Sequence, residues 1–326
     1  MKVCVLWRRF RNVELQKRID ENVFDDAYDE ALQHAEALKK AGHEVALIQW
    51  KKDTLSFYKE LMKEKPDIVF NASSKEEVAF LEVIGIPFVG SGLDLVSTCK
   101  ATRKKILAYH KIPTPKFTVI RDLKDINLQG LRFPLFVKPV RGRGSGGISD
   151  ENIVESREAL KTIAARIINS IKQPALVEEY IRGRELTVGL IGNGDPTVLP
   201  VVEIKYNGCK TNNFEHKMKD NEIIECPAKL SELELKLVTE TAKKTFKALG
   251  ARDYGRVDMI LSEDGIPYVL ELNTFAGLTM PEGEAHIGYM GYMARAAGLS
   301  ATQFLNKILY SALGRYKTEE NASQAV

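Results

Sequence analysis

The stretch GRVDMILSEDGIPYVLELN, residues 255–273, combines two apolar runs with a turn between them. Asp264-Gly265 lies between the runs, and this dipeptide is a strong signal for a two-residue hairpin turn. Side chains alternate between the two faces of a strand, so this hairpin has one apolar and one polar face. A longer turn would shift the register by one residue and mix the faces, so the clean separation favours the two-residue turn. The apolar face is predicted to contain Val257, Met259, Leu261, Tyr268, Leu270 and Leu272.

The polar face of this hairpin carries four functional groups. In the same register Asp258 faces Glu271 and Arg256 faces Asn273, and all four side chains project to one side. Two facing carboxylates repel each other unless a cation lies between them or a pKa rises. Oxygen ligands of this kind suit Mg²⁺ that holds nucleotide phosphates, and a nearby arginine can stabilise an anionic transition state. We therefore interpret the face as a metal or phosphate site rather than as a solvated surface with incidental ion pairs.

A glycine-rich loop precedes this hairpin in the stretch FVKPVRGRGSGGIS, residues 136–149. Three glycines between residues 142 and 147 have the spacing G-x-G-x-x-G, but a dinucleotide site needs a helix to begin at the third glycine. The following ISDENIVES, 148–156, predicts a returning strand instead, and the Walker A pattern is absent. Two strands joined by such a loop can fold over a triphosphate, with Lys138 in the incoming strand near a phosphate. A flexible hairpin tip is the alternative when the loop is considered alone.

Composition restricts the kind of protein. The chain has 326 residues, 44% of them hydrophobic, which is enough for two or three domains with their own cores. Its formal net charge of +3 gives no reason to expect nucleic acid or a membrane surface as a partner. The four cysteines form no C-x-x-C pair, which argues against a zinc site or a disulfide framework. The sequence has no apolar run suited to a signal peptide or a membrane span, so a cytoplasmic protein is expected.

The pattern of apolar residues predicts both α/β and α+β structure. At the start, strands alternate with helices, which indicates a parallel α/β layer. Later strands form hairpins, and the clearest helix, at 231–250, begins with a capping box from Ser231 to Glu234. The predicted strands are at 3–7, 43–50, 66–71, 117–120, 135–140, 146–150, 175–181, 185–192, 197–206, 257–261 and 267–273, and the other helices are at 25–42, 54–64, 99–111 and 156–171.

In this order, several segments resemble the ATP-grasp superfamily, and within it the D-alanine–D-alanine ligase family. The segments that carry the resemblance are Lys138 with the glycine loop, PALVEEYIRGRELTV (174–188), NNFEHKMKDNEIIECPA (212–228), GRVDMIL (255–261) and LELNTFAGLT (270–279). The resemblance extends from 85–92 to 298–309 and is weakest in the N-terminal third. It implies the ATP-grasp fold, with an N-terminal parallel α/β domain at 1–98, a small central α+β domain with the glycine flap at 99–183, a C-terminal α+β domain at 184–316 and a flexible tail at 317–326.

The resemblance also implies how ATP is bound. Lys100 and Lys138 would contact its phosphates, and the loop residues Gly144, Ser145 and Gly146 would cover them.

Three further residues follow from the same resemblance. Glu178 would meet the adenine amino group and Glu185 the ribose hydroxyls. Lys217, on the loop at 206–227, would reach the γ-phosphate.

The hairpin residues receive roles that agree with their pattern. Asp258, Glu271 and Asn273 would hold Mg²⁺, as two ions, with Mn²⁺ as an alternative. A substrate carboxylate would attack the γ-phosphate to give an acylphosphate and ADP, and an amine would then displace phosphate. Arg256 and the Gly277 backbone N–H would stabilise the oxyanion, and closure of the loop around Lys217 would exclude water.

The sequence departs from the family where the amino-acid substrates bind. The stretch WRRFRNVELQKRID, 7–20, replaces a glycine-rich turn with a Glu and a Ser, and its arginines at 8, 9 and 11 either recruit an acidic first substrate or form a surface basic cluster. Met218 stands where a tyrosine is expected. Glu282 stands where a serine would bind the carboxylate of the second substrate, which it would repel. Glu282 or Glu284 would instead attract a cationic group, or be solvated.

These observations lead to one main hypothesis and three alternatives. The main hypothesis is an ADP-forming carboxylate–amine ligase with small-molecule substrates, amino acids among them, and altered substrate subsites. The alternatives are a genuine D-alanine–D-alanine ligase, a non-catalytic ATP-binding module and an ATP-grasp kinase that does not ligate. A homodimer through the N-terminal domain is expected from the family.

Overall fold

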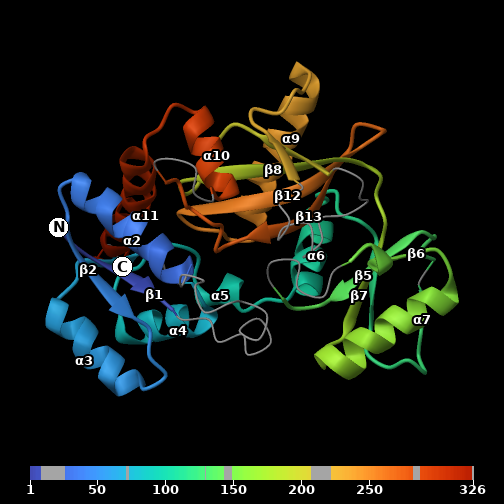
Figure 1. Cartoon of the computed structure of the whole chain (residues 1–326), viewed down its shortest axis with the longest axis horizontal. Coiled ribbons are helices and arrows are strands. Elements are labelled where there is room, and N and C mark those ends of the chain that lie inside the picture. The colour runs from blue at the N-terminus through green and yellow to red at the C-terminus, as the bar shows by residue number, and fades with distance from the viewer. Residues whose placement is uncertain are drawn as a thin grey trace.

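The computed structural model describes residues 1–8, 26–70, 73–128, 130–142, 149–206, 222–281 and 287–324, which form three sheets with helices around them (Figure 1). A parallel sheet lies at the left of the view, an antiparallel sheet at the right and a larger antiparallel sheet at the top centre. The predicted combination of α/β and α+β structure is confirmed.

The N-terminal sheet has the parallel arrangement that alternating strands and helices predict. Its central strand β1 pairs in parallel with a strand on each side. The strands are β1 (Lys2–Trp7), β2 (Glu44–Gln49) and β3 (Ile68–Phe70), and the helices are α2 (Asp26–Lys40), α3 (Thr54–Glu64), α4 (Lys75–Ile84) and the short α5 (Leu93–Val96). Ala31, Ala35 and Leu38 of α2 are fully buried, as the spacing of its apolar stripe predicts.

The second sheet has the strand order β4-β7-β5-β6, and the glycine loop lies between β5 and β6 in the sequence. Its elements are β4 (Phe117–Ile120), β5 (Leu135–Pro139), β6 (Ile153–Val154), β7 (Ala175–Glu179), the helix α7 (Arg157–Arg166) and its π-helical extension η2 (Ile167–Ile171). Strands β5 and β6 are antiparallel, which confirms a returning strand, but the strand predicted at 146–150 is wrong for its described residues. Asp150–Asn152 form a 3₁₀ turn (η1), because the Asn152 side chain accepts from the Ser149 N–H at 2.9 Å and so replaces strand pairing.

The third sheet has six strands, of which five follow the order β11-β10-β8-β12-β13 and β9 pairs with β8. Its strands are β8 (Gly183–Ile191), β9 (Thr197–Val198), β10 (Val202–Tyr206), β11 (Glu222–Glu225), β12 (Tyr254–Ser262) and β13 (Pro267–Asn273). The helices nearby are α6 (Lys100–Tyr109), α9 (Glu232–Ala248), α10 (Tyr289–Ala296) and α11 (Ala301–Gln324). Helix α9 begins with the predicted capping box, in which Ser231 and Glu234 bond reciprocally.

The β12–β13 hairpin has the predicted pairing at its polar end and a different one at its turn. Asp258 pairs with Glu271 and Arg256 with Asn273, but Met259 pairs with Val269, and the register shifts between Asp258 and Met259. The predicted two-residue turn is wrong, because the Ser262 N–H bonds to the Ile266 carbonyl across three residues.

A β-bulge cancels this longer turn. The extra residue of the turn shifts the register by one, and the bulge at Leu270 on β13 shifts it back before the polar pairs begin. Val269 is therefore fully buried, whereas Tyr268 and Leu270, which were expected on the apolar face, are only half-buried.

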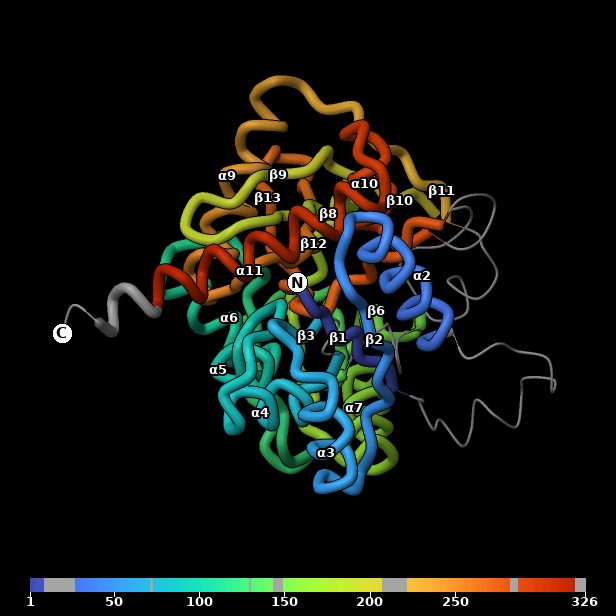
Figure 2. Tube along the Cα trace, turned by 90° about the vertical axis from the view of Figure 1, so that its left-hand side faces the viewer, coloured from blue at the N-terminus to red at the C-terminus, as the bar shows by residue number. Residues whose placement is uncertain are grey.

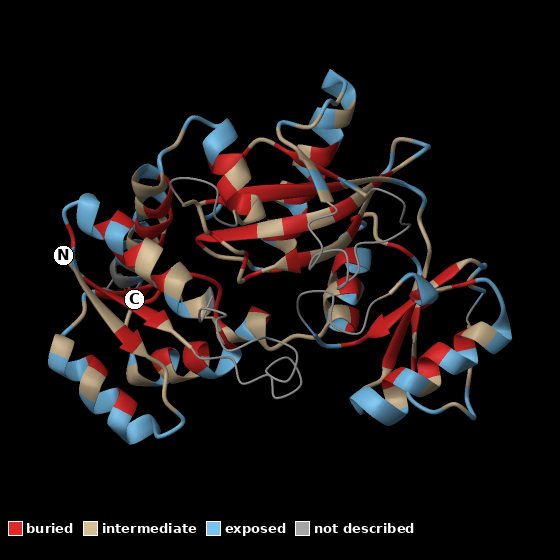
Figure 3. Ribbon diagram, in the orientation of Figure 1, coloured by how far each residue is buried: buried red, intermediate tan, exposed pale blue. Residues whose placement is uncertain are grey.

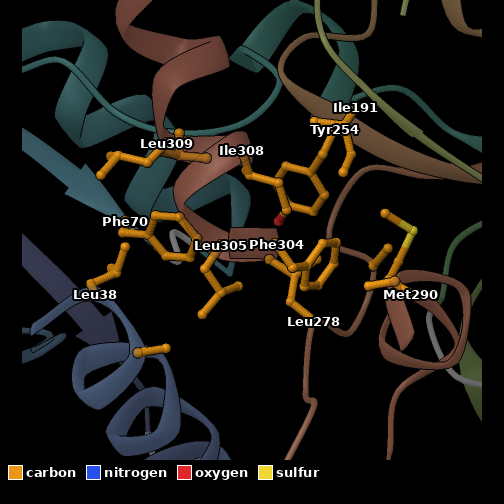
Figure 4. Packing of buried hydrophobic residues seen from close by; sticks show 14 of the residues in the cluster. Leu38, Phe70, Ile191, Tyr254, Leu278, Met290, Phe304, Leu305, Ile308 and Leu309 are labelled. Atoms are coloured by element: carbon orange, nitrogen blue, oxygen red, sulfur yellow. The ribbon is translucent and has the colours of Figure 1, made fainter. Parts of the chain in front are cut away.

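One hydrophobic core joins the first and third sheets. Figure 4 shows Leu38 and Phe70 from the N-terminal region on one side of the α11 side chains, and Ile191 and Tyr254 on the other. Figure 2 shows α11 crossing the molecule beside α2, with which it packs. The C-terminal helix thus fixes the N-terminal sheet against the third sheet through apolar burial.

Burial follows the layers of the fold. Figure 3 shows buried residues along β8 and β12, and exposed residues on the outer faces of α3, α7 and α9. Within the described segments, no helix combines the length and the apolar character that a membrane span requires. The divisions after residues 98, 183 and 316 stay a prediction.

Candidate active site

The hairpin places Asp258 at the centre of a hydrogen-bond network. Its carboxylate accepts from Nε and Nη2 of Arg256 at 2.9 and 3.0 Å and from the Asn273 side-chain amide at 2.7 Å. The Thr187 hydroxyl, from the neighbouring strand β8, donates to it at 2.6 Å. A bidentate arginine and two neutral donors fix the position of this carboxylate.

Glu271 is compensated by a cation from a different element. The Lys100 ammonium, at the start of α6, forms an ion pair with Glu271 and also donates to the Gly142 carbonyl at 3.3 Å. Burial acts to raise the pKa of Glu271, but the ammonium groups of Lys100 and Lys138 lower it to about 2. Each of the two facing carboxylates is thus paired with its own protein cation, Asp258 with Arg256 and Glu271 with Lys100.

A second charge cluster lies behind the first, between α6, β5 and β7. The Glu178 carboxylate is 2.8 Å from the ammonium of Lys104 and 2.8 Å from that of Lys138. All three side chains are buried. Burial acts to raise the pKa of Glu178, but the two ammonium groups lower it, so the cluster contains a fixed anion between two cations.

The remaining described site residues lie on adjoining segments. Glu185 precedes Thr187 by two residues on β8, so their side chains share a face of the sheet. Gly277 follows Asn273 by four residues, and its carbonyl lies beside Gly288 at the start of α10.

Arg256 is fixed by an aromatic ring as well. The carbon at the centre of its guanidinium lies 4.7 Å from the ring centre of Tyr289, in the first turn of α10. The Tyr289 hydroxyl donates to Glu222 on β11 at 2.5 Å. A cation–π contact and a bidentate carboxylate therefore set the orientation of the guanidinium.

Three residues of the site were missed from the sequence. Lys104 follows Lys100 by four residues on a helix, and this spacing, which places both on one face, was the one sequence signal for it. Thr187 follows Glu185 at the two-residue spacing of one strand face. Tyr289 had no such signal, because its contact with Arg256 depends on how α10 packs.

Several predicted residues lie outside the described segments. They are Gly144, Ser145 and Gly146 of the glycine loop, Lys217 and Met218 of the loop at 206–227, Glu282 and Glu284, and the arginines at 9 and 11.

The donor set suits a hard cation and a nucleotide. Within the described segments no group of three or more His, Cys, Asp or Glu side chains is arranged to hold a metal. The hairpin site instead offers two carboxylates, Asp258 and Glu271, and the side-chain amide of Asn273. Because the Asn273 Nδ2 atom donates to Asp258, its oxygen is the atom left for a cation. All the donors are oxygens, as Mg²⁺ prefers, and the cations Lys100, Lys138 and Arg256 nearby suit phosphate groups.

Comparison with known sequences identifies relatives over most of the chain. The family model described as "D-ala D-ala ligase C-terminus" matches residues 106–310. An uncharacterized protein of Sinorhizobium fredii, y4sG, is 32% identical over 300 residues, which cover 86% of each chain. The D-alanine–D-alanine ligase A of Bacillus cereus is 33% identical over 249 residues, 74% of this chain and 76% of that one.

Solved structures share the fold. The crystal structure of the D-alanine–D-alanine ligase from Bacillus anthracis complexed with ATP has a TM-score of 0.77 at 24% identity and covers 98% of this chain and 99% of that chain. The VanG D-Ala:D-Ser ligase from Enterococcus faecalis has a TM-score of 0.69 at 21% identity, with 95% and 99% covered.

Proposed function

Because the chain belongs to the D-alanine–D-alanine ligase family and has the ATP-grasp fold, we propose that its hairpin site carries out an ADP-forming carboxylate–amine ligation with altered substrate subsites. As a member of this family it is an ATP-dependent ligase that forms a C–N bond, and the family uses ATP with Mg²⁺. The substrates, the number of metal ions and the role of each residue are the proposed part.

The observation that carries the proposal is the convergence of charged groups from three elements. Lys100 from α6 pairs with Glu271, and Arg256 from β12 pairs with Asp258. Lys138 from β5 pairs with Glu178 and also acts electrostatically on Glu271. A cluster of cations beside two carboxylates is what a metal–triphosphate complex requires. A structural ion-pair network would need no amide oxygen beside it.

We assign Mg²⁺ to the oxygens of Asp258, Glu271 and Asn273, as two ions, with Mn²⁺ able to replace it. Bound Mg-ATP would supply the phosphoryl group that activates the substrate carboxylate as an acylphosphate. Lys100 and Lys138 would bind and orient the phosphates, and Glu185 the ribose.

The second half of the reaction needs a group that stabilises a tetrahedral oxyanion. The guanidinium of Arg256, held by Asp258 and Tyr289, would donate to this oxygen together with the Gly277 N–H. Because the guanidinium is already oriented, little reorganisation is needed when the amine attacks the acyl carbon.

The N-terminal sheet would contribute to the first substrate's site. Arg8 follows β1 at the carboxyl ends of the parallel strands, the edge at which ligands bind in such sheets. Among the described residues, its carboxylate neighbours are Glu76 and Glu77, at 3.6 and 4.0 Å, too far for good hydrogen bonds. Arg8 would therefore still have donors for an acidic first substrate.

Release of ADP tests the proposal. The protein is incubated with Mg-ATP and D-alanine, and in parallel with a panel of single amino acids and pairs, and the products are identified by mass spectrometry. ADP together with a conjugate other than D-alanyl-D-alanine is the expected result. D-alanyl-D-alanine as the main product would reject altered subsites and leave a genuine D-alanine–D-alanine ligase. ADP formation with a carboxylate alone, without a ligated product, would indicate a kinase.

A further inference from the structure

Lys104 is a buried lysine at the junction of two sheets. Its side chain is 1% exposed, and its ammonium lies 2.8 Å from a Glu178 oxygen and donates to the Thr114 hydroxyl at 2.6 Å. The same hydroxyl donates to the Val269 carbonyl of β13 at 2.8 Å. Since buried lysines occur in proteins almost only with partners, this one has a defined electrostatic task. It connects β7 of the second sheet with β13 of the third.

Glu178 is shared between Lys104 and a second lysine. Its other oxygen lies 2.8 Å from the Lys138 ammonium, whose side chain is 8% exposed. One carboxylate cannot neutralise two ammonium groups, so the three residues together carry one excess positive charge. Burial acts to lower the pKa of Lys138, but the carboxylates of Glu178, Glu271 and Asp258 raise it. Lys138 lies on β5, which leads to Gly142, whose carbonyl accepts from Lys100 beside Glu271.

We propose that Lys104 is a positioning residue for the nucleotide, because it takes up part of the charge of Glu178 and so leaves Lys138 with a positive charge for a phosphate. The inference rests on the proposed role of Lys138 in ATP binding. Lys104 itself is buried and touches neither ATP nor substrate. Without it, Glu178 would pair with Lys138 alone, and the charge available to the phosphate would fall.

The same arrangement gives Glu178 a task other than the one implied by resemblance. Its carboxylate is 2% exposed and ion-paired with two ammonium groups, so it acts on the phosphate site through Lys138. A contact between this carboxylate and the adenine amino group is not required for this task.

Calorimetric titration with Mg²⁺ and a non-hydrolysable ATP analogue tests the inference through binding rather than turnover. The variants are Lys104→Met, Glu178→Gln and the double variant, with Lys105→Met, at an exposed neighbouring position, as the control. We expect Lys104→Met to weaken binding by about tenfold, since one charge contact is lost at the phosphate. In the Glu178→Gln background, Lys104→Met should weaken analogue binding by less than about twofold, because no carboxylate at residue 178 then opposes the charge of Lys138.

Other results would overturn the inference. Equal affinity of Lys104→Met and Lys105→Met would show that Lys104 does not act on the site. An equal loss with and without Glu178 would show that Lys104 acts through packing. If the unaltered protein bound no ATP analogue, the proposed function would fail instead, so the two failures are distinguishable.

The unaltered protein offers a second measurement that needs no variant to fold. Burial lowers the pKa of Lys104 to about 8 against the opposing effect of Glu178. The charged groups that act on it from neighbouring elements are Glu178 on β7, Lys138 on β5 and Glu271 on β13. Analogue affinity should therefore fall by about tenfold between pH 7 and 9.5. An affinity that stays constant over this range would contradict the inference.

Discussion

Asp258 and Glu271 face each other across two strands, yet each is neutralised by its own cation. Arg256, two residues from Asp258 on the same strand, forms an ion pair with it, and Lys100 of α6 forms an ion pair with Glu271. The repulsion expected between the two carboxylates is thus relieved before any metal binds. Metal binding at Glu271 would release Lys100, which then has a free charge for a phosphate of the same nucleotide.

Replacing Glu271 by glutamine tests the metal assignment. The amide keeps the size of the side chain but removes the charge that pairs with Lys100 and would bind Mg²⁺. ADP release should fall at least about 100-fold, while the circular dichroism spectrum stays unchanged. Glu263→Gln, at an exposed position in the hairpin turn, is the control. Turnover equal to that control at low Mg²⁺ would reject the assignment.

The buried Lys104 should make stability depend on pH in an unusual direction. Its pKa is about 8 in the folded protein, against the ordinary lysine value of 10.5 in the unfolded chain, so between these values the unfolded chain binds more protons. The free energy of unfolding should therefore rise with pH over this window, by on the order of 3 kcal/mol at most, and stay lower below pH 8. Urea unfolding of the protein and of Lys104→Met, measured at pH 7 and 10, checks this. The variant should show no such gain, and equal pH dependence in both would contradict the assignment.

The hairpin and the helix that follows it show how elements place the site. The bulge at Leu270 compensates the three-residue turn, so the polar pairs are in register although the turn is not the expected one. Helix α10 then packs closely on the segment after β13: an added Cβ at Gly291 would lie 2.2 Å from the Thr279 carbonyl oxygen. This close approach sets the position of the segment that carries Gly277.

Replacing Gly291 by alanine should therefore reduce the turnover number more than ATP affinity. The methyl group would push residues 277–279 away from Arg256, and a displacement of about 1 Å lowers rates by about 10- to 100-fold. The KM for ATP should change little, because its proposed contacts lie on α6, β5, β8, β12 and β13 and not on residues 277–279. The control is Gly314→Ala on α11, where an added Cβ meets no atom within 4 Å. A variant with unchanged turnover would show that the contact does not position the segment.

At the level of the whole molecule, one buried ion pair holds distant segments together. Asp253, fully buried, accepts from Arg315 of α11 at 2.9 and 3.0 Å, from the Asn193 side chain at 3.0 Å and from the Gly90 N–H at 2.8 Å. Arg315 also donates to the Phe88 carbonyl at 3.0 Å. The pair therefore links α11, the turn after β8 and the end of the N-terminal sheet.

Replacing Arg315 by methionine should destabilise the protein without changing its nucleotide site. The change leaves Asp253 buried without its cation, which costs about 3–5 kcal/mol. Chemical denaturation should show this loss, while the affinity for the ATP analogue of the folded variant stays within about twofold. Lys317→Met, at an exposed position on the same helix, is the control. A loss no larger than that of the control would contradict a structural role for the pair.

Local patterns were sufficient for much of the fold. Hydrophobic spacing predicted the helices α2, α3 and α9 and the parallel sheet, because burial of one face imposes a period on the sequence. The same reasoning placed Arg256, Asp258, Glu271 and Asn273 on paired strands.

The remaining features depended on contacts between residues far apart in the chain. The predicted turn was one residue too short, yet the predicted pairing at Asp258 was correct. A bulge in β13, which local propensity does not reveal, restored the register between the turn and Asp258. Lys104 appeared in the sequence only as one charge of a basic helix, and its burial depends on β7 supplying Glu178. The Tyr289 ring over Arg256 likewise depends on the packing of α10. The sequence therefore determined which residue types are present and how apolar and polar residues alternate along each helix and strand. Long-range packing determined which charged groups became partners, since the energy of an ion pair depends on distance and burial.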